Sequence, residues 1–225
     1  MKTTSDDTLR FQSVRDSLAK FFEGTLNREM IFIKLSTNGL IVKNPPLPSV
    51  LGIAAAKYKL RPRREIVFLN QYERYYLPKE SFNAKAILVN GLDEPTLFSK
   101  RNGHNYPEHF DEDKVSLRKY CKNTQLYAGH NIDGFEVKLL PWLHDPENKT
   151  FDIMKENVNI LRLEHDDYGF YEDWKWPTFQ ELLDFYSIPV PDDCTHSGMA
   201  SVKLIASTFQ EMLRRSELRR IVVSC

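Results

Sequence analysis

Cysteines and long apolar runs are both scarce in this sequence. The three cysteines, Cys121, Cys194 and Cys225, are odd in number and far apart. This argues against a disulfide framework and against a zinc site built from cysteines. No apolar run is long enough to span a bilayer, and the N-terminus has no apolar signal-peptide core. We therefore expect a cytoplasmic protein with no membrane partner.

Net charge is absent as well. Lysine plus arginine and aspartate plus glutamate both number 31 among the 225 residues. No overall field therefore draws the chain to nucleic acid, and any basic contact surface has to be local. A chain of this length can form one large α/β domain, or one domain with an appendage.

The hydrophobic pattern predicts three strands in series, followed by helices that alternate with a further strand. This order indicates a mixed β-sheet flanked by helices. The strands are expected at 30–33, 51–58, 65–69 and 126–128. The helices are expected at 6–24, 84–90, 111–122, 130–140, 178–186 and 197–215. The stretch 145–175 is expected to be mostly loop with one short helix.

Four segments resemble the motifs of one family, in its order and spacing. IFIKLSTNGL (31–40) is similar to a strand that ends in Asp-x-Glu-Thr-(Thr/Asn)-Gly-Leu, and AKAILVNGL (84–92) looks like the helix that follows. YAGHNIDGFEVKLL (127–140) resembles the second motif, and residues 176–212 resemble the third, in which His-x-Ala-x-x-Asp opens the last helix. The family is that of the DnaQ-like (DEDDh) 3′-5′ exonucleases.

This resemblance implies a ribonuclease H-like fold and a division of the chain. The exonuclease-type domain would comprise residues 28–216, with an N-terminal helical extension at 1–27 and a C-terminal tail at 217–225. The extension lies outside the resemblance. Two roles for its helix stay open, a strap packed over the sheet or a docking element for a partner.

The family binds two divalent metal ions through four carboxylates, and a histidine orients the attacking water. The metals activate this water and stabilise the charge on the phosphate. The two acids of the first motif correspond to Lys34 and Ser36. The acid of the second motif corresponds to Glu136, the histidine to His196 and the last acid to Ser201. Three ligands are thus replaced, and Glu136 and His196 are the catalytic remnants.

No shift of the alignment restores four acids. Residues 30–42 contain none, and a slip of one residue would turn the side chain to the other face of the strand. Asp133 is an alternative to Glu136. We prefer Glu136, because Phe135 and Glu136 together match the family's Phe-Asp pair. Asp192 and Asp193 precede the last helix.

The lysine also changes the electrostatics that we expect at this site. An ammonium a few ångström from a metal ion costs several kcal/mol at an intermediate dielectric. We expect Lys34 to occupy the vacated metal position and to form an ion pair with Glu136. No metal or other cofactor is then expected.

The resemblance and the lost ligands together favour a catalytically inactive exonuclease-like domain. It would be a nucleic-acid-binding or protein-binding subunit of a nucleic-acid-processing complex. The neutral net charge favours a protein partner. Single-stranded nucleic acid could then occupy the old substrate groove. The alternative is a metal-dependent 3′-5′ exonuclease with an unusual or residual site, and Mg²⁺ or Mn²⁺ would then be its cofactor.

Two clusters of basic residues are candidates for nucleic-acid binding. Arg61, Arg63 and Arg64 lie in the expected hairpin between the second and third strands, and Lys100 and Arg101 lie further along. Either cluster could grip phosphates. Each could equally be a solvated surface.

Overall fold

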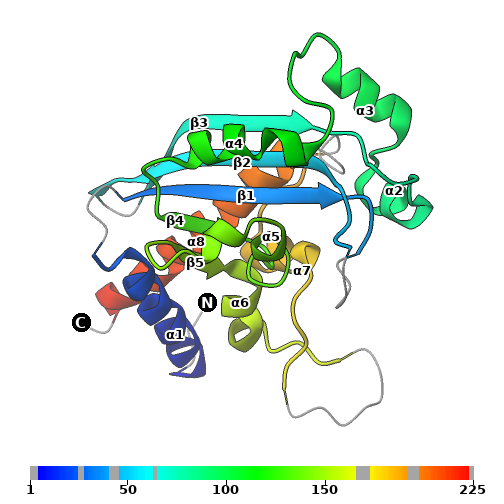
Figure 1. Cartoon of the computed structure of the whole chain (residues 1–225). Helices are drawn as coiled ribbons and strands as arrows, with labels where there is room; N and C mark the ends of the chain where they lie inside the picture. The colour runs from blue at the N-terminus through cyan, green and yellow to red at the C-terminus, as the bar shows by residue number, and fades with distance from the viewer. Residues whose placement is uncertain are drawn as a thin grey trace.

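The structure is a computed structural model that describes residues 5–24, 28–40, 46–62, 65–165, 173–191 and 198–222, with side chains described within these ranges from residue 11 to residue 216. The elements follow one another as shown in Figure 1. They are α1 (Ser5–Phe22), β1 (Glu29–Thr37), β2 (Val50–Leu60), β3 (Ile66–Tyr75), α2 (Ala84–Asn90), α3 (Glu94–Arg101), α4 (Phe110–Cys121), β4 (Leu126–Gly129), α5 (Glu136–Leu139), a 3₁₀ helix (Pro141–His144), β5 (Lys149–Asp152), α6 (Ile153–Leu161), α7 (Phe179–Tyr186) and α8 (Gly198–Val222).

The strands form one mixed sheet in the described part of the chain. Their order is β3-β2-β1-β4-β5, with β1 in the middle. β1 is antiparallel to β2 and β2 to β3, whereas β4 runs parallel to both β1 and β5. The sheet has helices on both faces, which confirms the α/β class expected from the sequence.

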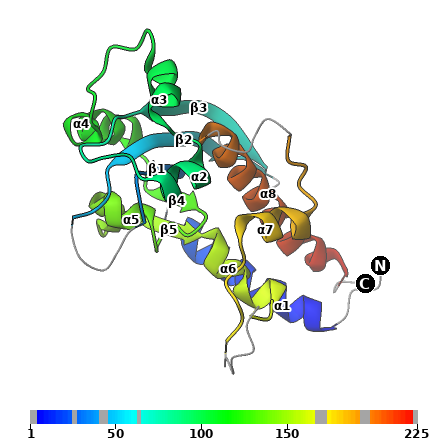
Figure 2. The same ribbon diagram turned by 90° about the vertical axis from the view of Figure 1, so that its right-hand side faces the viewer.

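Side chains of β1 alternate between the two faces of the sheet and so belong to two cores. Met30 and Phe32 face α8, where the ring centroid of Phe32 lies 5.3 Å from that of Phe209. Ile31 and Ile33 belong to the core that includes residues of α4 and α5. Figures 1 and 2 show α4 and α8 on opposite sides of the sheet. This alternation decides which side chains of β1 reach α8.

Helix α1 packs into the core on the α8 side. It contacts α8, α6 and β5, and the centroid of the Phe21 ring lies 5.4 Å from that of Phe151 and 6.1 Å from that of Phe209. Its buried apolar residues are Phe11, Val14, Leu18 and Phe21. Of the two roles that the sequence leaves open, the structure shows the packed strap. The division of the chain at residues 27 and 216 stays a prediction.

The helix expected at 130–140 is wrong over its first half. Only α5 at Glu136–Leu139 is helical, because Asn131 adopts a left-handed conformation with φ of 62° and turns the chain. Gly134 is packed against the same residue, and a Cβ atom there would lie 2.1 Å from Asn131 Oδ1. A larger residue at 134 would force this turn to move.

None of the helices that the structure describes is both long and apolar enough to cross a membrane.

Candidate functional site

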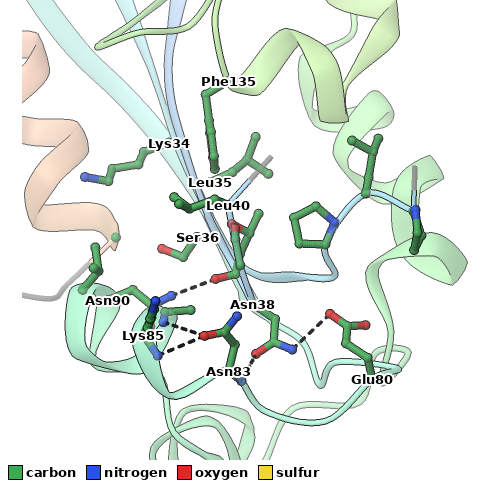
Figure 3. Close-up of a pocket in the computed structure, with 18 of the residues that line it drawn as sticks. Lys34, Leu35, Ser36, Asn38, Leu40, Glu80, Asn83, Lys85, Asn90 and Phe135 are labelled. Carbon is green, nitrogen blue, oxygen red and sulfur yellow. Dashed lines mark hydrogen bonds between the residues drawn. The ribbon is translucent and has the colours of Figure 1, made fainter. Parts of the chain in front are cut away.

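The carboxyl end of β1 and the first turn of α8 bring three of the predicted site positions together. Lys34 and Ser36 are two residues apart and therefore point to the same face of the sheet. Gly198 lets α8 approach that face, since a Cβ atom there would lie 3.1 Å from Cβ of Ala54 in β2. Lys34, Ser36 and Ser201 all line a cavity of about 690 Å³. We call it the strand-end cavity (Figure 3).

A hydrogen-bonded clamp forms the far wall of the strand-end cavity. Asn38, buried after β1, donates through Nδ2 to Glu80 Oε1 at 3.0 Å and to the Ser81 carbonyl at 2.9 Å. Its Oδ1 accepts from the backbone N–H of Asn83 at 3.0 Å, and Asn90 Nδ2 donates to the Thr37 carbonyl at 3.0 Å. Figure 3 shows the contacts of Asn38 with Glu80 and Asn83, and together these hydrogen bonds fasten α2 to the end of β1.

Apolar side chains of the same wall remain open to solvent. Leu40 is 86% exposed and Val89 is 79% exposed, and both line the strand-end cavity. The cavity therefore combines apolar surface with a floor that carries hydroxyl groups and one ammonium group.

Glu136, the one acid at the four ligand positions, is buried beneath this floor. It is 3% exposed, and its Oε1 accepts a hydrogen bond from the backbone N–H of Leu35 at 3.2 Å. Its Oε2 is buried with no hydrogen-bond partner. Burial raises the pKa of Glu136 to about 8, although the Leu35 N–H and the Lys34 charge oppose the shift. The acid form therefore predominates at neutral pH.

The ion pair expected between Lys34 and Glu136 is wrong. The ion pairs of the described residues do not include one between these two side chains. The Lys34 ammonium instead lies 5.7 Å from the centre of the Phe179 ring in α7, and Figure 3 shows the side chain extending from β1 toward α8. The Glu136 carboxyl bonds to the backbone of β1 and is not held by the lysine. Burial lowers the pKa of Lys34, which the charge of Glu136 partly offsets.

His130 lies beside Lys34 and has a structural role. Its Nε2 is 3.2 Å from the Pro177 carbonyl, so this nitrogen donates, and its ring centroid is 5.3 Å from that of Phe179. Burial lowers the pKa of His130 to about 4, and the Lys34 charge adds to the shift. The imidazole is therefore neutral at pH 7 and ties the end of β4 to the segment before α7.

The described residues do not fit a two-metal centre. Mg²⁺ and Mn²⁺ need several oxygen ligands, ideally carboxylates, and the strand-end cavity presents Lys34, Ser36 and Ser201 at three of the four positions. The part of the chain that the structure describes holds no group of three or more His, Cys, Asp or Glu that could bind a metal. His196 lies outside the described residues, as do Asp192 and Asp193.

The basic candidates are split between the two ends of the sheet. β2 runs antiparallel to β1, with Lys59 opposite Glu29 and Gly52 opposite Ser36. Arg61 follows β2 and is exposed at the end remote from the cavity. Seven residues of strand separate Glu29 from Ser36, about 23 Å at the usual rise. Arg63 and Arg64 lie outside the described residues.

Lys100 and Arg101 lie at the same end of the sheet as the cavity. The Lys100 ammonium is 4.5 Å from the centre of the Tyr75 ring and donates to its hydroxyl at 3.3 Å. Arg101 donates to the backbone carbonyls of Tyr75, Tyr106 and Pro107 at 2.6, 3.1 and 3.1 Å. The Arg101 guanidinium thus fastens the loop before α4. Nucleic-acid binding by either residue stays a prediction.

Replacing Arg61, Arg63 and Arg64 by alanine should weaken the binding of a long single strand and leave that of a trinucleotide unchanged. The reason is the separation of about 23 Å between the hairpin and the strand-end cavity, which a trinucleotide held in the cavity would not bridge. Each lost phosphate contact lowers the salt slope by about 0.7. Fluorescence anisotropy over a range of salt concentrations measures both quantities. Unchanged affinity and slope for the long strand would exclude the hairpin as a contact surface.

Glu73, which holds the start of α8 in place, is a positioning residue that the sequence pattern does not reveal. Its Oε1 accepts from the Met199 N–H at 3.1 Å and from the Tyr75 hydroxyl at 2.7 Å. This carboxylate satisfies a free N–H group in the first turn of the helix. The expected third strand ends at Leu69, so nothing in the pattern places Glu73 near α8.

Comparison with solved structures identifies the architecture. The chain matches cell-death related nuclease 4 with a TM-score of 0.59 and 13% identity, over 84% of this chain and 64% of that one. It matches exonuclease X in complex with 5′ overhanging duplex DNA with a TM-score of 0.53 and 14% identity, over 84% and 92%. The chain has the fold of these nucleases.

A third structure, of 3′-end specific recognition of histone mRNA stem-loop by a 3′-exonuclease, matches with a TM-score of 0.57 and 13% identity, over 85% of this chain and 84% of that one. These neighbours confirm the ribonuclease H-like fold class. No protein-family model and no curated protein matches the sequence. The likeness therefore concerns the fold, and this chain spans less than two thirds of cell-death related nuclease 4.

Proposed function

We propose that this chain is a catalytically inactive exonuclease-like domain that binds single-stranded nucleic acid in the strand-end cavity. The observation that carries the proposal is the replacement of family carboxylates by Lys34, Ser36 and Ser201, which line one cavity at the end of the central strand. The fold supports it, because similar structures include exonuclease X with DNA and a 3′-exonuclease that recognises an mRNA stem-loop.

The chemistry of the replaced residues supports the loss of catalysis. Two-metal hydrolysis requires both ions to be held by oxygen ligands a few ångström apart. The remaining acid, Glu136, is buried and its Oε1 accepts from the β1 backbone. One carboxylate cannot supply the several oxygen ligands that two ions require, and the nearby Lys34 ammonium repels a divalent cation.

The alternative function is a metal-dependent 3′-5′ exonuclease with an unusual or residual site. It is favoured by the fold, which is similar to that of cell-death related nuclease 4 and exonuclease X, and by the family's histidine at His196 with Asp192 and Asp193 close by in the sequence. On this alternative, Mg²⁺ or Mn²⁺ is the cofactor.

One incubation separates the two functions. End-labelled single-stranded DNA and RNA are mixed with the chain in Mg²⁺ or Mn²⁺, and both the bound fraction and the strand length are followed. Binding without shortening supports the proposal. If the strand shortens from the 3′ end and a His196→Ala variant no longer shortens it, the result supports the alternative. If the chain neither binds the strand nor shortens it, the result contradicts both functions.

We also propose that the domain works in the cytoplasm with a protein partner in a larger nucleic-acid-processing complex. The scattered cysteines support the cytoplasm. The support for a protein partner is α2, in which no residue is buried although the helix is apolar. Leu88 is 81% exposed and Val89 is 79% exposed, and exposed apolar side chains that lie together are typical of interaction surfaces. Purification from native cells with bound proteins and nucleic acid tests this part.

A further inference from the structure

The Lys34 ammonium lies at the floor of the strand-end cavity. Within the described residues it has no hydrogen bond and no ion pair, and its one contact with a ring is the face of Phe179 at 5.7 Å. A partly buried lysine without a partner destabilises a fold, because the charge loses hydration without compensation. Such a residue at a cavity suggests a ligand that supplies the missing negative charge.

The charges that face the strand-end cavity favour an anion. Lys34 and Lys85 are cations, and Glu80 is the one acid among the described lining residues. Both oxygens of Glu80 are already used, since Oε1 accepts from Ser49 N at 3.0 Å and Oε2 accepts from Ser49 Oγ at 2.6 Å. These hydrogen bonds do not neutralise the carboxylate, so the described lining residues carry two positive charges against one negative charge.

Two hydroxyl donors lie in the same cavity as this ammonium. Ser36 is on the same face of β1 as Lys34, and Ser201 is in the first turn of α8. Neither hydroxyl makes a hydrogen bond with another of the described residues. The Met199 N–H of that turn is already bonded to Glu73 at 3.1 Å, so Lys34 is the principal positive group at this corner.

We propose that Lys34, with the hydroxyls of Ser36 and Ser201, binds a backbone phosphate of a single-stranded nucleic acid without any divalent metal. This inference rests on the proposed function and specifies how the strand is held. A lysine ammonium binds phosphate as a point charge, and hydroxyl groups add hydrogen bonds. The phosphate in turn favours the charged form of the lysine.

The experiment measures single-strand binding by the full chain in EDTA over a range of salt concentrations. Lys34→Met keeps the length and apolar stem of the side chain and removes its charge. We expect this variant to bind about tenfold or more weakly, with a salt slope lower by about 0.7. Lys34→Arg keeps a cation and should retain most of the binding.

Lys119→Met is the matched control, because Lys119 is an exposed lysine on α4, on the opposite side of the sheet. It should bind as the wild type does, and melting curves verify that every variant is folded. If the wild type binds and Lys34→Met binds with the same affinity, the phosphate site is overturned and the proposed function still stands. Wild-type binding that EDTA abolishes would also overturn it. No wild-type binding to DNA or RNA would contradict the proposed function itself.

Discussion

Replacing Glu136 by glutamine is expected to stabilise the fold increasingly as the pH rises from about 4.5 to about 8. Burial raises the pKa of this carboxyl from 4.5 to about 8. Between these values the unfolded chain has released the proton that the folded chain still holds, so stability falls with pH by about 1.4 kcal/mol per unit. The full shift corresponds to about 5 kcal/mol. Glutamine cannot ionise, and its oxygen can still accept from the Leu35 N–H.

Urea unfolding of the wild type and the variant at several pH values between 5 and 9 measures this difference. His130, whose pKa is lowered to about 4, contributes stability that is lost as the pH falls below 6.5. The lowered pKa of Lys34 gives a contribution that rises with pH wherever the unfolded chain still holds a proton that the folded chain has released. Both groups are present in the two proteins, so the difference isolates Glu136 apart from its coupling to Lys34.

An exposed carboxyl provides the control. Glu112→Gln on α4 makes the same chemical change at the surface and should give no pH-dependent difference of comparable size. If the difference in the free energy of unfolding between the wild type and Glu136→Gln stays constant between pH 5 and pH 9, Glu136 is ionised in the folded chain. The description of the floor of the cavity would then be wrong.

Restoring the four family acids should make the stability of the fold depend on divalent metal. The quadruple variant Lys34→Asp, Ser36→Glu, Glu136→Asp and Ser201→Asp places three carboxylates in the strand-end cavity and keeps a fourth beneath its floor. At an effective dielectric of 20, two unit charges 4 Å apart repel by about 4 kcal/mol, so the variant should be strongly destabilised in EDTA. Mg²⁺ at 100 times its dissociation constant would restore about 2.7 kcal/mol.

Melting temperatures in EDTA and in Mg²⁺ or Mn²⁺ measure this effect, and the single-strand assay shows whether shortening from the 3′ end returns. A neutral variant at the same positions, Lys34→Ala, Ser36→Ala, Glu136→Gln and Ser201→Ala, should not respond to metal. If metal raised the melting temperature of the four-acid variant no more than that of the neutral variant, the four positions would not converge on a metal site.

The arrangement of the site is predictable from the sequence because it follows from short, well-defined elements. The run around Ile31 has the apolar residues of a buried strand, and alternation then places Lys34 and Ser36 on one face. The expected start of α8 lies one residue from its observed position at Gly198. The positions that the resemblance assigns to these two elements, Lys34, Ser36 and Ser201, line one cavity, and their role stays a prediction.

Other elements are not predictable because their sequence patterns are weak. β3 is expected to end at Leu69 but continues to Tyr75. The pattern misses its second half because β3 is an edge strand, paired only with β2, and this half carries polar residues. β5 at Lys149–Asp152 is not expected at all. Four residues paired parallel to β4 have no alternation that a pattern could reveal. The pattern also misses α3, at Glu94–Arg101, since Leu97 is its one buried residue.

The prediction of an ion pair between Lys34 and Glu136 is wrong for a different reason. The resemblance indicates that both residues replace ligands of the same metal pair, but not which neighbour each side chain contacts. The Glu136 carboxyl is satisfied in part by a backbone N–H of β1, and the lysine lies against an aromatic ring of α7. These are tertiary contacts between segments about 100 and 145 residues apart, and no local pattern encodes them.

A crystal structure of the chain grown with a single-stranded oligonucleotide and Mn²⁺ tests the central claim most directly. Manganese scatters anomalously, so the ion and the phosphate are located independently in one experiment. The account predicts a phosphate oxygen about 2.7–3.2 Å from Lys34 Nζ and no anomalous peak at Glu136. An anomalous peak that joins Glu136 to the phosphate, with Lys34 turned away, would contradict it.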